Sequence, residues 1–211
     1  MKPLPLAALV AASVLSTVIV LDIVWNAHQA EEVGPWLDAT EHPYLVRTIG
    51  VVHTVLYGLL VAALIQSGHA IDGGRKFVRT LRWILIGCYG SFAILYCSMI
   101  VDPSFNTSGV YAIAVTVVFA VSLLLPIVLG FALIRDRAFR VPAILLIAPI
   151  VVLPLTMLLE AFTSWAHPGY METVVNFGVA LLCVAASTRG VAEVPDTGER
   201  HVVETAPSRS H

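Results

Sequence analysis

Four ionisable residues lie inside long apolar stretches of this sequence, where such groups are unusual. They are Asp22, Arg47, His53 and Glu160. A charged or titratable side chain is costly in hydrocarbon, so it generally faces a protein interior or a water-filled cavity and marks an ion, proton or substrate site. We therefore treat these four residues as the primary candidates for function.

The expected depths of these residues place them in one half of the membrane. At ~1.5 Å per helical residue, His53 lies about 13 Å below Tyr44, whereas the other three lie within about 8 Å of the nearest interfacial aromatic residue. Arg47 keeps its proton and therefore needs an acid at its own depth. Asp22 and Glu160 are the acids at that depth, and whichever is left unpaired would tend to be neutral and able to exchange a proton.

These properties suggest a proton relay. We expect Asp22 and Arg47 to form a clasp or gate and Glu160 to be the titrating group. His53 could carry the relay inward, because its unperturbed pKa is near neutrality, with Tyr57 one turn deeper on the same helix face. The alternative is structural: an Asp–Arg clasp near headgroup water, and a histidine that only hydrogen-bonds across helices. Three further polar residues belong to the same layer and are secondary candidates: Asp102, Glu172 and Asn176.

Histidine and carboxylate residues also gather at the expected outer surface, where they could in principle bind zinc, copper or iron. The group consists of His28, Glu31, Glu32, His42, His167 and Glu172. No pair has the tight spacing of a metal-binding helix, so we predict no metal site, with His28 and His167 as weak candidates only. No other cofactor is indicated: His53 lacks a second histidine at its depth for haem, and phosphate-loop, nucleophile-elbow and dinucleotide motifs are missing.

The elements that must position these residues are six apolar runs. They cover roughly residues 4–25, 44–65, 77–101, 109–133, 141–165 and 170–187. Each is close to the ~20 residues that a helix needs to cross a bilayer. The sequence is 58% hydrophobic and only 12% charged, which no soluble domain of this length would accommodate. We predict an all-α polytopic membrane protein, a six-helix bundle over residues 1–187. The first run is too long for a signal peptide and is expected to remain as a helix.

The distribution of positive charge predicts the orientation. Of the 12 Lys and Arg residues, all except Arg47 fall on one side of the six runs. Positive residues concentrate on the cytoplasmic side, so we expect both termini to be cytoplasmic and the titratable layer to face outward. Short loops favour a bacterial inner membrane. Residues 188–211 are polar and are expected to form a disordered cytoplasmic tail. No basic stripe with interleaved aromatic residues is present, so nucleic acid is not an expected partner.

Two further patterns concern packing. Ala8, Ala12 and Ser16 recur at four-residue spacing, which lets helix backbones approach closely, either within the chain or in a homo-oligomer. Pro149 and Pro154 interrupt the fifth run, so this helix is not expected to be straight.

Three functions are compatible with these observations. The first is an outward-facing polar cavity that binds or transports a small solute with proton coupling. The second is a membrane-embedded enzyme or redox protein acting on a lipid, isoprenoid or quinone, in which the same acids serve as general acid and base. The third is an accessory or scaffold subunit. The lipid bilayer is the one partner common to all three, and the sequence leaves open whether the protein is an enzyme.

Overall fold

A computed structural model describes residues 3–29, 34–167 and 169–192. Within this part of the chain the fold is helical, with no strand. The longest helices are α1 (Pro3–His28), α2 (Pro43–Gln66), α4 (Lys76–Val101), α5 (Gly109–Leu133) and α8 (Gly169–Ala192). Two shorter helices, α6 (Arg140–Ile147) and α7 (Pro149–Glu160), follow one another along the fifth run. One-turn elements complete the fold: α3 (Gly68–Asp72), η1 (Pro103–Thr107) and η2 (Arg137–Phe139).

Six stretches of helix are long and apolar enough to cross a membrane, as the sequence predicted. Five are single helices, and the sixth is the α6–α7 segment. Many large apolar side chains on the outside of the bundle are exposed, among them Ile94, Val110 and Phe162. A bundle with this surface matches lipid rather than water. The prediction of an all-helical fold with six helices able to span a membrane is therefore confirmed.

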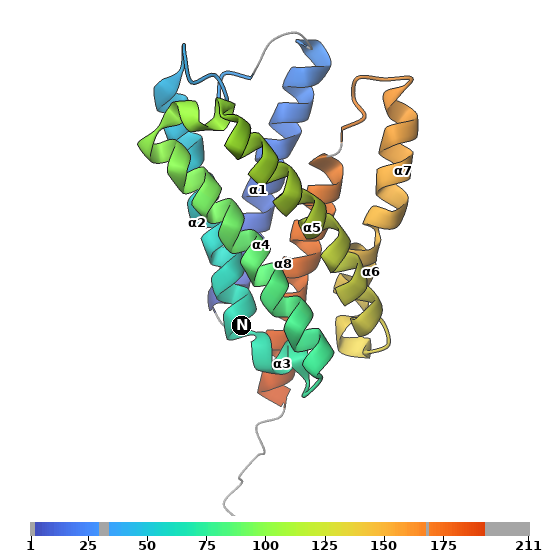
Figure 1. The fold of residues 1–211 in the computed structure, drawn as a ribbon. Helices are drawn as coiled ribbons and strands as arrows, with labels where there is room; N and C mark the ends of the chain where they lie inside the picture. Colours follow the sequence, from blue (N-terminus) through green and yellow to red (C-terminus); the bar gives the residue numbers. More distant parts are fainter. Residues whose placement is uncertain (1–2, 30–33, 168, 193–211) are drawn as a thin grey trace, which may run out of the picture.

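The fifth run is broken, in agreement with the expectation that it is not straight. α6 ends at Ile147, and α7 begins at Pro149, which has no backbone N–H to continue the hydrogen-bonding ladder. The helix also stops at Glu160 and does not continue to residue 165. In Figure 1, α7 stands at the edge of the bundle, away from α1 and α2.

α8 occupies the centre of the bundle. Over its most apolar stretch 56% of the residues are buried, against 17% for α5. It packs against α1 and α6, and α2 packs against α4 (Figure 1). The predicted tail boundary at residue 188 falls inside the last turns of α8, where Arg189 donates to Asp136 Oδ2 at 2.8 Å. The rest of the predicted disordered tail, from residue 193, lies outside the described residues.

The small-residue face of α1 is used within the chain. Ala8 and Ala12 are fully buried and Ser16 is 8% exposed. α1 packs on α8 and α2, so the neighbour predicted for this face is intramolecular. A second copy of the chain could reach the face only by displacing these helices.

The two ends of the bundle differ in chemistry. We call the end that carries His28, Pro43 and Gly169 the upper end, and the end that carries Pro3, α3 and Ala192 the lower end, as drawn in Figure 1.

The lower end holds an ion pair that was not predicted from the sequence. Asp72 accepts from Arg82 Nε at 2.9 Å and from Arg82 Nη2 at 3.0 Å, and both side chains are almost completely buried.

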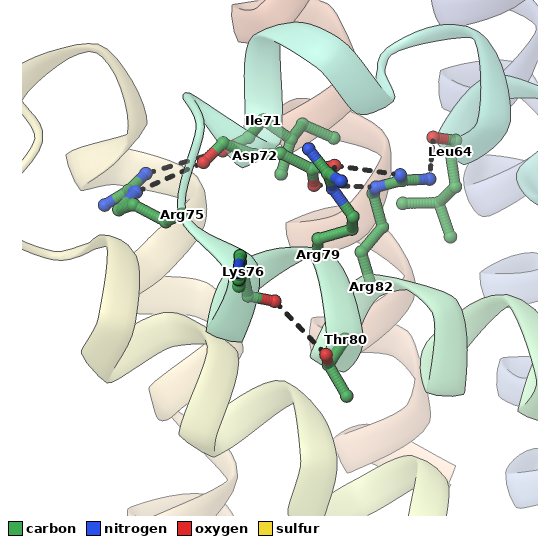
Figure 2. Close-up of polar contacts among 8 residues, drawn as sticks. All are labelled: Leu64, Ile71, Asp72, Arg75, Lys76, Arg79, Thr80 and Arg82. Atoms are coloured by element: carbon green, nitrogen blue, oxygen red, sulfur yellow. Dashed lines mark hydrogen bonds and ion pairs between the residues drawn. The ribbon is translucent and has the colours of Figure 1, made fainter.

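Arg82 ties together three elements (Figure 2). It reaches Asp72 at the end of α3 and donates through Nη1 to the Leu64 carbonyl of α2, while its own backbone belongs to α4. Gly68 leaves room for it, because a Cβ there would lie 2.6 Å from Arg82 Cζ. Arg79 also contacts Asp72, at 3.4 Å, but its side chain is 57% exposed.

The two arginines that share Asp72 provide a matched test. Arg82→Ala leaves the carboxylate buried without its bidentate partner, and removing one member of a buried pair costs about 3–5 kcal/mol. Arg79→Ala removes an exposed partner and should change stability by about 0–1 kcal/mol. Unfolding of each variant in mixed detergent micelles measures the difference. Equal losses for the two variants would show that Arg82–Asp72 does not hold the lower end together.

Candidate functional site

A partly enclosed cavity of about 150 Å³ lies at the upper end. Its walls come from α1, α2, α4, the first turn of α8 and the connections before α2 and α8. The lining residues are Val18, Ile19, Asp22, Trp36, Leu37, Ile49, His53, Tyr96, His167, Gly169 and Glu172. Two acids and two histidines belong to this set, and it contains no lysine or arginine.

Glu172 is placed by the start of α8. It lies in the first turn of that helix, where the free N–H groups and the helix dipole favour a negative charge. Its Oε1 accepts a hydrogen bond from the Tyr57 hydroxyl of α2. Gly169 lets this turn approach α1, because a Cβ at Gly169 would lie only 2.6 Å from Ile19 Cγ2.

His53 is held from two sides in the middle of α2. Its ring is 6% exposed and stacks on Tyr96 with 4.2 Å between ring centroids. Its Nδ1 lies 2.9 Å from the Ile49 carbonyl oxygen, which can only accept, so we assign the proton of the neutral ring to Nδ1. Nε2 is then left as an acceptor on a ring that lines the cavity.

Asp22 is oriented by neutral donors and not by a cation. Trp36 Nε1 donates to Oδ1 at 3.1 Å and Asn26 Nδ2 donates to Oδ2 at 3.3 Å. These hydrogen bonds fix the carboxylate in the cavity wall without neutralising its charge.

Below the cavity, aromatic rings surround Tyr57. Phe92, Tyr89 and Tyr96 of α4 stack on it, with ring centroids 5.1, 5.7 and 5.9 Å away. A second, much smaller pocket of about 10 Å³ lies beside these rings. It is lined by Tyr57, Tyr89, Phe92, Ser122, Leu123, Glu172, Val175 and Asn176. We call it the inner pocket. Glu172 lines both the upper cavity and the inner pocket.

Two of the four primary candidates are placed elsewhere. Arg47 is exposed and makes no ion pair with Asp22, so the predicted clasp is not formed. The inward face of α2 carries Val46, Gly50 and His53, and Arg47 lies outside it. Glu160 is exposed at the end of α7 and does not line the cavity. Asp22 and His53 both line the cavity, and its second acid is Glu172 rather than Glu160.

The remaining candidates have varied surroundings. Asn176 accepts from the Tyr89 hydroxyl at 2.8 Å and is 1% exposed. Asp102 caps η1, accepting from Ser104 N at 3.0 Å, and is exposed. His28 is exposed and packs edge-on against Trp165. His167 lines the cavity and accepts from Gly169 N through Nδ1 at 3.1 Å.

His28 and His167 therefore form no ligand set, and Glu31 and Glu32 lie outside the described residues. Ligand atoms of Asp38, Glu41 and His42 do lie within 4.8 Å of one another. The backbone N–H of Glu41, and then that of Thr40, donates to the Asp38 carboxylate and holds its pKa below the ordinary value. This surface cluster is explained by loop structure, and we assign no metal to it.

The aromatic side of the site was not predicted from the sequence. Tyr89, Phe92 and Tyr96 recur at intervals of three and four residues, which places them on one helix face. This spacing was visible in the sequence and could have identified the face of α4 that meets Tyr57. The contribution of Trp36 had no such signal, because it comes from a connection between helices.

No protein-family model, curated protein or solved structure matches this chain.

Gly169 should be needed for the site to assemble. Gly169→Ala forces α8 away from α1 or displaces Ile19, a strain of the kind that costs about 1–3 kcal/mol. Gly58→Ala is the control, because a Cβ at Gly58 meets nothing within 4 Å and alanine favours a helix interior. Unfolding of both variants in detergent, followed by Trp fluorescence, measures the difference. A Gly169 variant as stable as the Gly58 variant would contradict the close approach.

Proposed function

We propose that this protein binds a small cationic solute in the upper cavity and couples its binding to protonation of Glu172. The observation that carries the proposal is the charge of the cavity wall. Asp22 and Glu172 contribute carboxyl groups, His53 can accept a hydrogen bond through Nε2, and no lysine or arginine is among the described residues that line the cavity. Such a wall attracts cations and repels anions.

The size and shape of the cavity restrict the solute. A volume of about 150 Å³ is below the roughly 300–1,000 Å³ of pockets for drug-sized ligands. It suits a metal ion with some of its water or a small ammonium compound. Rings of Trp36 and Tyr96 also line the cavity, and aromatic faces attract ammonium groups.

Solute binding is coupled to protonation because the cation and the proton compete for the carboxyl group of Glu172. A proton on Glu172 removes the charge that attracts the cation, so each ligand disfavours the other. The Tyr57 hydroxyl, which donates to Oε1, keeps this carboxyl in place. His53 supplies a neighbouring acceptor that could receive the displaced proton.

An apolar barrier lies between the site and the lower end. Leu60 and Leu64 of α2 and Leu85 of α4 are fully buried, and they lie between the inner pocket and the Asp72–Arg82 pair along their helices. Solute therefore has access from the upper end alone in this conformation. Transport to the other side would require the bundle to rearrange.

We further propose that the lower end faces the cytoplasm of a bacterial cell. Most of the described positive residues lie there, around the start of α4, in the segment from α5 to the first residue of α6, and in the last turns of α8: Arg75, Lys76, Arg79, Arg82, Arg135, Arg137, Arg140 and Arg189. This is the distribution expected of cytoplasmic segments. Both termini would then be cytoplasmic, in the inner membrane, and the upper cavity would open to the outside.

An enzyme acting on a lipid, isoprenoid or quinone has less support. The structure does contain an apolar groove of about 560 Å³ beside the α6–α7 break. Its lining shares no residue with the acid-lined cavity. The groove thus offers room for a hydrocarbon chain but no chemical groups to act on it.

Glu172→Gln should abolish most cation binding. The change keeps the shape of the side chain and removes its charge, and loss of about 1.4 kcal/mol or more corresponds to at least tenfold weaker binding. Calorimetry of purified protein with methylammonium and the alkali metal ions as probes measures the affinity. The release of protons on binding, measured in weakly buffered solution, tests the coupling.

Glu160→Gln is the matched control, because it is the same change at an exposed acid outside the cavity. It should leave affinity and proton release unchanged. Unaltered binding by the Glu172 variant, or equal losses in both variants, would refute the proposal. A normal thermal unfolding profile for each variant excludes misfolding as the cause.

A further inference from the structure

The inner pocket contains a buried donor without a partner. Asn176 is 1% exposed, and its Oδ1 is occupied by the Tyr89 hydroxyl at 2.8 Å. Its Nδ2 has no hydrogen-bonding partner among the described residues. The Glu172 side chain is close enough to interact with Asn176, but Nδ2 donates no well-formed hydrogen bond to it. A buried amide N–H without an acceptor costs about 1–3 kcal/mol.

The residues around the inner pocket determine which ligand could accept a hydrogen bond from Asn176 Nδ2. An acceptor is needed for Nδ2, whereas Glu172 and Ser122, which also line the pocket, can offer oxygens as acceptors. Ser122 already donates its hydroxyl hydrogen to the Phe119 carbonyl at 2.8 Å, so its Oγ remains available only as an acceptor. The ligand must therefore accept one hydrogen bond and donate two. Water does both, whereas a metal cation accepts none.

The volume agrees with a single water molecule. The inner pocket measures about 10 Å³, close to the lower limit of ~10–15 Å³ that one water needs, and a buried water typically has 2–4 polar partners. We propose that one water molecule is a fixed part of this site. It accepts from Asn176 Nδ2 and donates to the Glu172 carboxyl and to Ser122 Oγ.

This water would have a role in the proposed function, on which this part of the inference rests. Glu172 lines both the upper cavity and the inner pocket. A water on its inner side gives the carboxyl a second hydrogen-bonding partner when a cation displaces its proton. The polar chain then runs from the cavity through Glu172 and the water to Asn176 and Tyr89. It ends there, because the buried leucines Leu60 and Leu85 follow toward the lower end.

A structure of the full chain in nanodiscs, at a resolution that shows ordered water, tests the site. The expected result is a peak within hydrogen-bonding distance of Asn176 Nδ2 and Glu172, present in sodium and in potassium buffers. Asn176→Leu keeps the size of the side chain but removes the amide oxygen and nitrogen, so it should abolish the peak. Tyr89→Phe frees the amide to turn and should weaken it, whereas Tyr111→Phe, whose hydroxyl contacts Met99 Sδ at 3.6 Å, should leave it unchanged.

Three results would overturn the inference. The first is an Asn176 amide that donates directly to Glu172 with no water peak between them. The second is a water peak that appears with only one of the two cations. The third is a water peak that survives in Asn176→Leu. The inference and the proposed function can fail separately. If the water is present but Glu172→Gln still binds cations, the function fails and the water site stands. If cations bind but no water is found, the water site fails and the proposed function stands.

Discussion

The hydrogen bond between the Tyr57 hydroxyl and Glu172 is the contact around which the upper half of the bundle is arranged. It joins the middle of α2 to the first turn of α8, where Gly169 lets α8 approach α1 closely. Helix backbones in a bilayer satisfy their own polar groups, but side chains must find partners inside the protein. Tyr57 therefore supplies what water would otherwise provide to a carboxyl group at this depth. Stacked rings of α4 pack against Tyr57 in the orientation that reaches the acid.

The bundle is consequently layered along its length. Acids, histidines and aromatic rings form the upper layer, fully buried leucines such as Leu60 and Leu85 form the middle, and the Asp72–Arg82 pair closes the lower layer. The two charged layers use opposite strategies. Asp72 is matched by a permanent cation and is fixed, whereas Asp22 and Glu172 have only neutral donors among the described residues. The proposed function belongs to the layer whose charge is not neutralised.

The sequence was sufficient to predict the number of helices that are long and apolar enough to cross a membrane, because that number follows from counting residues along each apolar run. It was not sufficient to predict the direction in which a side chain points around its helix. His53 and Arg47 are six residues apart on α2, yet one lines the cavity and the other is exposed. Glu160 does not line the cavity for a related reason, since α7 begins after the break at Pro149 and stands at the edge of the bundle. Glu172 was recognised only as a secondary candidate because its partner, Tyr57, is 115 residues away in sequence.

The break between α6 and α7 has a mechanical consequence. α7 is joined to α6 at Pro149 without a continuous hydrogen-bonding ladder, and most of its side chains are exposed. Because little packing holds this helix between the break and the connection to α8, we expect its tilt to adjust to the thickness of the hydrocarbon. This segment would then accommodate bilayers of short or long lipids. α1, α2, α4 and α8, which are locked together by small residues and side-chain hydrogen bonds, keep the geometry of the acidic cavity as the lipid composition varies.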